Sequence, residues 1–151
     1  MKNGIAIYPG LDNTKEENIV LIEAAAKAGL TRLFTSLQIP ETDVEKMKAE
    51  LSETLQTARE AGMEIISDVS PRTLELLDIS SFSPHAFQAL GISVLRLDDG
   101  FSPEEIAQLS HEKNLHLSLN AATMTTAFLS ALRNAGADFT HVDAIYNFYP
   151  R

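Results

Sequence analysis

One repeated unit constrains the fold of this chain more than any other feature of its sequence. An apolar helical stretch ends in a glycine and is followed at once by an apolar run at Gly29, Gly62, Gly91 and Gly136. Glycine is favoured just past a helix end because the chain turns through positive φ there. Asn114 holds an equivalent place before LHLSLNA, and IAIYPG is a first apolar run near the N-terminus. About six strands alternating with helices are therefore expected.

The expected helix starts carry their own signals. A capping box, in which a hydroxyl and a carboxylate satisfy free backbone N–H groups, is predicted at Thr14 with Glu17, Thr42 with Glu45, and Ser102 with Glu105. Proline follows serine at Pro71 and Pro103, as is typical of the first helical residue. The predicted helices cover about 15–28, 43–60, 71–78, 84–89, 103–112 and 124–135.

Strict alternation of strands and helices predicts a parallel sheet covered by helices. Two architectures fit: an open doubly wound sheet, or part of a (β/α)₈ barrel. A length of 151 residues favours the open sheet, because a complete barrel takes about 250 residues.

The polar side chains of the strands favour the barrel instead. Residues two apart lie on one face of a strand, which groups Ile66, Asp68 and Ser70; Val94, Arg96 and Asp98; His116, Ser118 and Asn120; and Asp143, Ile145 and Asn147. Strands covered on both faces should be apolar on both, whereas a barrel has an inner face and an active site at the C-terminal mouth. We therefore predict an α/β, parallel, TIM-barrel-like fold with about six βα units.

Composition excludes several classes of function. Lys and Arg total 12 against 21 Asp and Glu, and the resulting net charge of −9 disfavours nucleic acids and anionic membranes as partners. No apolar stretch is as long as a membrane span or the apolar part of a signal peptide, so a cytoplasmic protein is expected. Cysteine is absent, and the chain has neither GxGxxG nor a Walker loop; its four histidines form no HExxH pair. We expect no cofactor and no metal: DFTHVD (138–143) has the residue types of a metal cluster, but His141 and Asp143 begin a strand, at the bottom of the barrel.

Six short segments occur in an order that resembles one family. They are GIAIYPG, LFTSLQIPE (33–41), DVSP (68–71), LRLDDGF (95–101), LSLNA (117–121) and NFYPR (147–151). Together they resemble the MupG-type 6-phospho-N-acetylmuramidases, formerly an uncharacterised "outer surface" protein family with a TIM-barrel domain. The resemblance implies that residues 1–151 are the N-terminal part of the barrel domain, with its last units and a smaller C-terminal domain absent.

The resemblance also implies a function. It indicates a cytoplasmic glycoside hydrolase of cell-wall (peptidoglycan) recycling. The substrate would be a phosphorylated amino-sugar disaccharide, cleaved between N-acetylmuramic acid 6-phosphate and N-acetylglucosamine.

Glycoside hydrolysis usually takes two carboxyl groups, one protonated and one ionised. We predict Asp98 as the first catalytic carboxyl group and Asp68 as the second, because both end strands on the inward face. Arg96 would bind the phosphate or the lactyl carboxylate through its bidentate guanidinium. A purely structural ion pair between Arg96 and either aspartate is the alternative.

Further substrate contacts are predicted at Asn120 and Asn147, whose amides suit sugar hydroxyls but also cap turns. Tyr149 would line the sugar site, and Tyr8 would pack at the barrel entrance. Two other functions stay open. One is a non-catalytic barrel fragment that self-associates through its exposed sheet edges; the other is an open α/β domain that binds a small ligand.

Overall fold

The structure, a computed structural model, describes residues 2–79, 84–98, 100–112, 116–120 and 125–145. Its strands are β1 (Gly4–Ala6), β2 (Arg32–Ser36), β3 (Glu64–Val69), β4 (Ile92–Leu97), β5 (His116–Asn120) and β6 (Val142–Ile145). Its helices are α1 (Lys15–Lys27), α2 (Val44–Glu60), α3 (Pro71–Leu76), α4 (Pro84–Ala89), α5 (Pro103–Ser110) and α6 (Thr126–Asn134), with a 3₁₀ turn η2 (Phe139–His141) before β6. The six predicted helices are all present.

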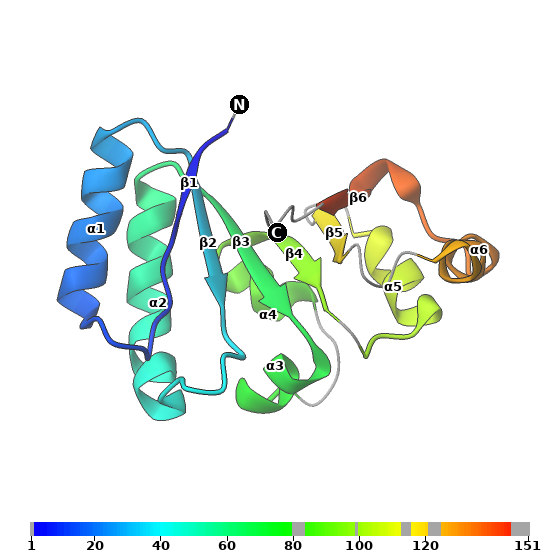
Figure 1. The fold of residues 1–151 in the computed structure, drawn as a ribbon, viewed down its shortest axis with the longest axis horizontal. Coiled ribbons are helices and arrows are strands. Elements are labelled where there is room, and N and C mark those ends of the chain that lie inside the picture. Colours follow the sequence, from blue (N-terminus) through cyan, green and yellow to red (C-terminus); the bar gives the residue numbers. More distant parts are fainter. Residues whose placement is uncertain (1, 80–83, 99, 113–115, 121–124, 146–151) are drawn as a thin grey trace, which may run out of the picture.

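The strands form one parallel sheet in the order β1-β2-β3-β4-β5-β6. A doubly wound sheet reverses its strand order at a switch point, whereas consecutive order is that of a barrel wall. The predicted barrel-like α/β fold is therefore confirmed, and the open doubly wound alternative is wrong. Figure 1 shows the arrowheads of β2, β3 and β4 pointing toward one edge, the C-terminal edge of the sheet.

The two faces of the sheet differ in chemistry. One face packs against the helices: Leu33, Ile65, Leu95 and Leu117 join Ile22 of α1 and other helix residues in a single hydrophobic core. All five side chains are fully buried, and full burial of such a side chain stabilises a fold by about 1.5–3 kcal/mol. The opposite face is the one that carries the predicted polar residues.

The helix ends follow the predicted signals with one exception. Capping boxes are present at Thr14 with Glu17 and at Ser102 with Glu105. The box predicted at Thr42 is wrong: Asp43 is the N-cap of α2, and its side chain accepts from the Lys46 N–H at 3.1 Å. The physical reason is tertiary, because the Asp43 N–H donates to the Gly10 carbonyl at 2.9 Å and holds Asp43 just outside the helix.

The glycines that end the helices confirm the turn prediction. Gly29, Gly62, Gly91 and Gly136 all have φ between +79° and +85°. Asn114, the fifth position predicted to end a helix, lies outside the described residues.

Candidate active site

A row of polar residues crosses the sheet near its C-terminal edge. The strand register pairs Ser36 with Asp68, Asp68 with Arg96, and Arg96 with Ser118. Register partners in a parallel sheet point to the same side, so these side chains share the face opposite the core. The predicted inward polar face is therefore confirmed on β3, β4 and β5, and Ser36 extends it to β2. The side chains predicted to continue it on β6 are not among those described.

Arg96 and Asp68 form an ion pair within this row. The Arg96 Nε lies 3.3 Å from Asp68 Oδ1, and the two side chains are 19% and 18% exposed. The guanidinium also lies over the Phe34 ring, with Cζ 5.8 Å from the centroid. Tyr8, two residues past the end of β1, meets the Phe34 ring edge to face at 6.3 Å and so packs against the ring that lies beneath the cation.

Asp98, just past the end of β4, is held by Gln38, which lies in the loop after β2. Gln38 Nε2 donates to Asp98 Oδ2 at 3.1 Å, and the Asp98 N–H donates to the Val69 carbonyl at 2.9 Å. The Gln38 Oε1 accepts from the Ser70 hydroxyl and from the Thr73 hydroxyl, the latter at 3.0 Å. Two donors on Oε1 fix the amide so that its nitrogen faces Asp98.

The surroundings of Asp68 change its proton affinity. Burial raises the pKa of this carboxyl from 3.8 to about 6; the Arg96 charge opposes the rise and the nearby Asp98 charge adds to it. The contact with Arg96 lacks hydrogen-bond geometry, and among the described residues Asp68 Oδ1 has no hydrogen-bond partner. Asp68 can therefore hold or release a proton close to neutral pH.

The structure brings together three of the six predicted site residues, and the side chains of the other three are not among those described. Asp68, Arg96 and Asp98 converge, since the charges of Arg96 and Asp98 both act on Asp68. Asn120 ends β5 in register with Ile145, but its side chain is not among those described. Asn147 and Tyr149 lie outside the described residues.

Gln38 is the site residue that sequence reasoning missed. It lies in the LFTSLQIPE segment, two residues beyond Ser36 and four beyond Phe34, so strand alternation puts it on the same face. That spacing was the available signal. Its partners, 32 to 60 residues away in sequence, could not be read from the chain.

The part of the chain that the structure describes was compared with two further kinds of site, a metal centre and a membrane span. There, no group of three or more His, Asp or Glu side chains is placed to hold a metal ion. No helix in the same ranges is long and apolar enough to cross a membrane.

A wall of parallel βα units in consecutive order, with two carboxyl groups and an arginine near its C-terminal edge, defines a TIM-barrel-type α/β protein. The sequence profile described as 6-phospho-N-acetylmuramidase, N-terminal, matches residues 3–151. The chain belongs to this family.

Solved structures agree with the fold. A conserved Enterococcus faecalis protein of unknown function is 30% identical with a TM-score of 0.79, over 100% of this chain and 40% of that one. An uncharacterised Bacillus cereus protein is 31% identical with a TM-score of 0.72, and the match covers 99% of this chain and 39% of the Bacillus cereus chain.

More distant structures share the fold alone. The Thermotoga maritima phospho-2-dehydro-3-deoxyheptonate aldolase is 15% identical with a TM-score of 0.56, over 95% of this chain and 40% of that one. This chain thus spans about two fifths of the length of each of these structures. No curated protein sequence matches it.

Proposed function

We propose that the polar row at the C-terminal edge is the acid–base part of a glycosidase site, acting on a sugar that carries a phosphate. The observation that carries the proposal is the convergence of Asp68, Arg96 and Asp98 at this edge in a chain of the 6-phospho-N-acetylmuramidase family. The proposed substrate is N-acetylmuramic acid 6-phosphate linked to N-acetylglucosamine. Its place in cell-wall recycling and the cytoplasmic location stay predictions from the sequence resemblance.

The two carboxyl groups suit different roles. In a glycosidase, the carboxyl group that acts as the acid has a higher pKa than the one that acts as base or nucleophile, because the two groups have different surroundings. Burial raises the pKa of Asp68 to about 6, which suits a general acid that protonates the leaving-group oxygen. The Gln38 amide donates to Asp98 and fixes the orientation of this carboxyl group, which we assign as the base or nucleophile on the opposite side of the bond.

Arg96 is proposed to bind an anionic group of the substrate. Its guanidinium is the cation in the polar row, lies over Phe34 and pairs with Asp68. A guanidinium binds carboxylate and phosphate groups through a bidentate fork. Arg96 also lowers the pKa of Asp68, so an anion bound to Arg96 would weaken that effect and favour the protonated acid. Substrate binding and proton loading would then support each other.

The test is hydrolysis of the phosphorylated disaccharide, followed by chromatography of the released sugars. We expect Asp68→Asn and Asp98→Asn to abolish release while the folded chain persists by circular dichroism. Glu64→Gln is the matched control, because Glu64 is an ion-paired acid at the other end of the same strand, 2.7 Å from Arg32. Release that survives in Asp68→Asn, or is lost equally in Glu64→Gln, contradicts the assignment.

A second reading follows from the length comparison. The chain spans 40% of the Enterococcus faecalis protein, so we propose as the alternative that this chain supplies the carboxyl pair but turns over substrate only with further barrel units. No release from the chain alone, with release after the remaining portion is added, would favour this reading. No release in either condition would contradict both.

A further inference from the structure

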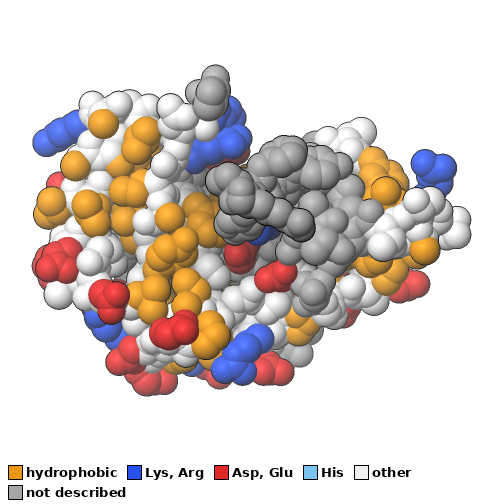
Figure 2. All heavy atoms as spheres, viewed as in Figure 1, with side chains coloured by type: hydrophobic (Ala, Val, Ile, Leu, Met, Phe, Trp, Pro, Cys, Tyr) orange, Lys and Arg blue, Asp and Glu red, His pale blue; other side chains and the backbone are white. Residues whose placement is uncertain are grey.

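Asp98 is held differently from most carboxyl groups of this chain. The chain has 21 Asp and Glu residues, and Figure 2 shows acidic side chains at several separate places on the visible face. Asp98 is partly buried instead, and groups from outside its own strand hold it twice. Its N–H donates to the Val69 carbonyl at 2.9 Å, and its Oδ2 accepts from Gln38 Nε2 at 3.1 Å. The backbone and the side chain of Asp98 are therefore fixed separately.

A chain of hydrogen bonds sets which end of the Gln38 amide faces Asp98. It begins at the Ser70 backbone N–H, a group that can only donate, which bonds to Thr73 Oγ1 at 3.1 Å. The Thr73 hydroxyl in turn donates to Gln38 Oε1 at 3.0 Å, and the Ser70 hydroxyl donates to the same atom. Gln38 Oε1 therefore faces α3, and Gln38 Nε2 faces Asp98.

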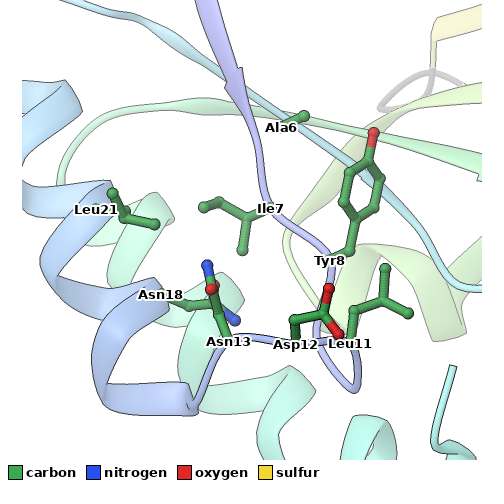
Figure 3. A pocket seen from close by; sticks show the side chains of 8 residues that line it. All are labelled: Ala6, Ile7, Tyr8, Leu11, Asp12, Asn13, Asn18 and Leu21. Atoms are coloured by element: carbon green, nitrogen blue, oxygen red, sulfur yellow. The ribbon is translucent and has the colours of Figure 1, made fainter.

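Another buried amide shows that partners at both ends are not automatic in this fold. Asn18 lines a cavity of about 170 Å³ between β1 and α1, shown in Figure 3. Its Oδ1 accepts from Asn13 Nδ2 at 3.3 Å, but its own Nδ2 has no hydrogen-bond partner among the described residues. The Gln38 amide has partners at both ends, and they come from two other βα units. The fold therefore fixes the direction of this amide.

Thr73 is the part of this chain of hydrogen bonds that lies farthest from solvent. It is 0% exposed, so it cannot touch a substrate bound at the polar row. It belongs to α3, which follows directly on the end of β3 in Figure 1. Gln38 follows β2 and Asp98 follows β4, so the hydrogen bonds connect the ends of three neighbouring strands.

We propose that Thr73 is a positioning residue for Asp98 and acts through the Gln38 amide. This inference rests on the proposed function, in which Asp98 is the base or nucleophile. Such a group must be held to within about 0.5 Å, and a misplacement of about 1 Å can lower a rate about a hundredfold. Without the Thr73 hydroxyl, Gln38 Oε1 keeps one donor instead of two, and the amide and the carboxyl group gain freedom to turn. Substrate still binds, but Asp98 is less often in its reactive position.

The first experiment removes the Thr73 hydroxyl and measures hydrolysis of the phosphorylated disaccharide. Thr73→Val should lower kcat at least about tenfold with KM nearly unchanged, and Thr73→Ser, which keeps a hydroxyl, should restore most of the rate. Thr54→Val is the matched control: Thr54 is also 0% exposed in a helix, and its hydroxyl donates to the Glu50 carbonyl at 2.9 Å. This control should leave kcat unchanged even where it lowers stability.

A second variant changes the Asp98 contact and leaves α3 intact. Gln38→Glu keeps an oxygen for the two hydroxyl groups but replaces the donor to Asp98 with an oxygen that repels it. It should lower kcat at least as far as Thr73→Val, and combining the two should not multiply their effects, because both act on one contact. Gln56→Glu is the control and should leave kcat unchanged: Gln56 is exposed on α2 and donates to Glu60 Oε1 at 2.9 Å.

One measurement needs no substrate. NMR of protein labelled with carbon-13 and nitrogen-15 should show a scalar coupling across the hydrogen bond from Gln38 Nε2 to the Asp98 carboxyl carbon. The coupling should weaken in Thr73→Val and persist in Thr73→Ser.

Three outcomes overturn the proposal: no coupling in the natural chain, an unchanged kcat in Thr73→Val, or an equal loss of kcat in Thr54→Val. A natural chain that shows the coupling but releases no sugar, alone or with the remaining portion added, contradicts the proposed function and removes the role of Thr73 with it. The two failures are therefore distinguishable.

Discussion

Replacing Asp68 by asparagine should stabilise this protein at neutral pH while removing its proposed acid. Burial raises the pKa of this carboxyl from 3.8 to about 6 in the folded state. Each tenfold change in proton affinity corresponds to about 1.4 kcal/mol, so the ionised group is less favourable by about 3 kcal/mol in the folded chain than in the unfolded chain. Its side chain is only 18% exposed, so solvent screening removes little of this.

The pH dependence has a definite sign. Below pH 3.8 the carboxyl of Asp68 is protonated in both states and makes no difference. Between pH 3.8 and about 6 the unfolded chain releases the proton while the folded chain retains it, so the free energy of unfolding falls as the pH rises. Above about pH 6 the full destabilisation of about 3 kcal/mol is present.

Asparagine resembles the protonated carboxyl and does not titrate. We therefore expect Asp68→Asn to match the natural protein near pH 4 and to exceed its stability by up to about 3 kcal/mol at pH 8. Urea denaturation at pH 4, 5, 6, 7 and 8, followed by circular dichroism, measures the difference at each pH.

A control separates this effect from the loss of any ion pair. The Glu64 and Arg32 side chains are 33% and 35% exposed, so Glu64→Gln should lower stability by about 1 kcal/mol at most. An Asp68→Asn variant that is less stable than the natural protein at pH 8, or whose effect is the same at pH 4 and pH 8, would refute the reasoning.

Three further predictions follow from single contacts. Arg96→Gln removes the charge that lowers the pKa of Asp68, so that pKa should rise above about 6 in a carbon-13 carboxyl titration by NMR. Gly10→Ala should cost more stability in urea than Gly29→Ala: both positions have positive φ, but an added Cβ meets the Asp43 carbonyl oxygen at 2.6 Å only at Gly10. Asp43→Ala removes the N-cap of α2 and should cost about 1 kcal/mol in the same assay; an unchanged midpoint would exclude Asp43 as the cap.

The Asp68 prediction also bears on function. A residue whose removal stabilises the fold is retained against the folding free energy, which is typical of sites where chemistry needs an unfavourable charge. Arg96 only partly compensates the burial of Asp68, and Asp98 adds to the cost. A stabilising Asp68→Asn substitution would therefore favour the proposed acid over the alternative of a purely structural ion pair between Arg96 and Asp68.

Local signals determined the elements of this protein. Capping boxes set the starts of α1 and α5, and the glycines after the helices turn the chain into the next strand because only they adopt positive φ without strain. Strand alternation grouped Asp68 with Ser70 and Arg96 with Asp98, each on one face of its own strand, because side chains of a strand repeat every two residues.

Tertiary structure decided which of these groups meet. Gln38 contacts Asp98 across 60 residues of sequence, and nothing local in either segment specifies that contact. Asp43 rather than Thr42 caps α2, because a hydrogen bond to Gly10 from another part of the chain holds it there. The proton affinity of Asp68 likewise depends on burial and on two charges carried by a neighbouring strand and its end. Periodicity can be read along a chain, whereas burial and contact distance exist only once the strands lie side by side.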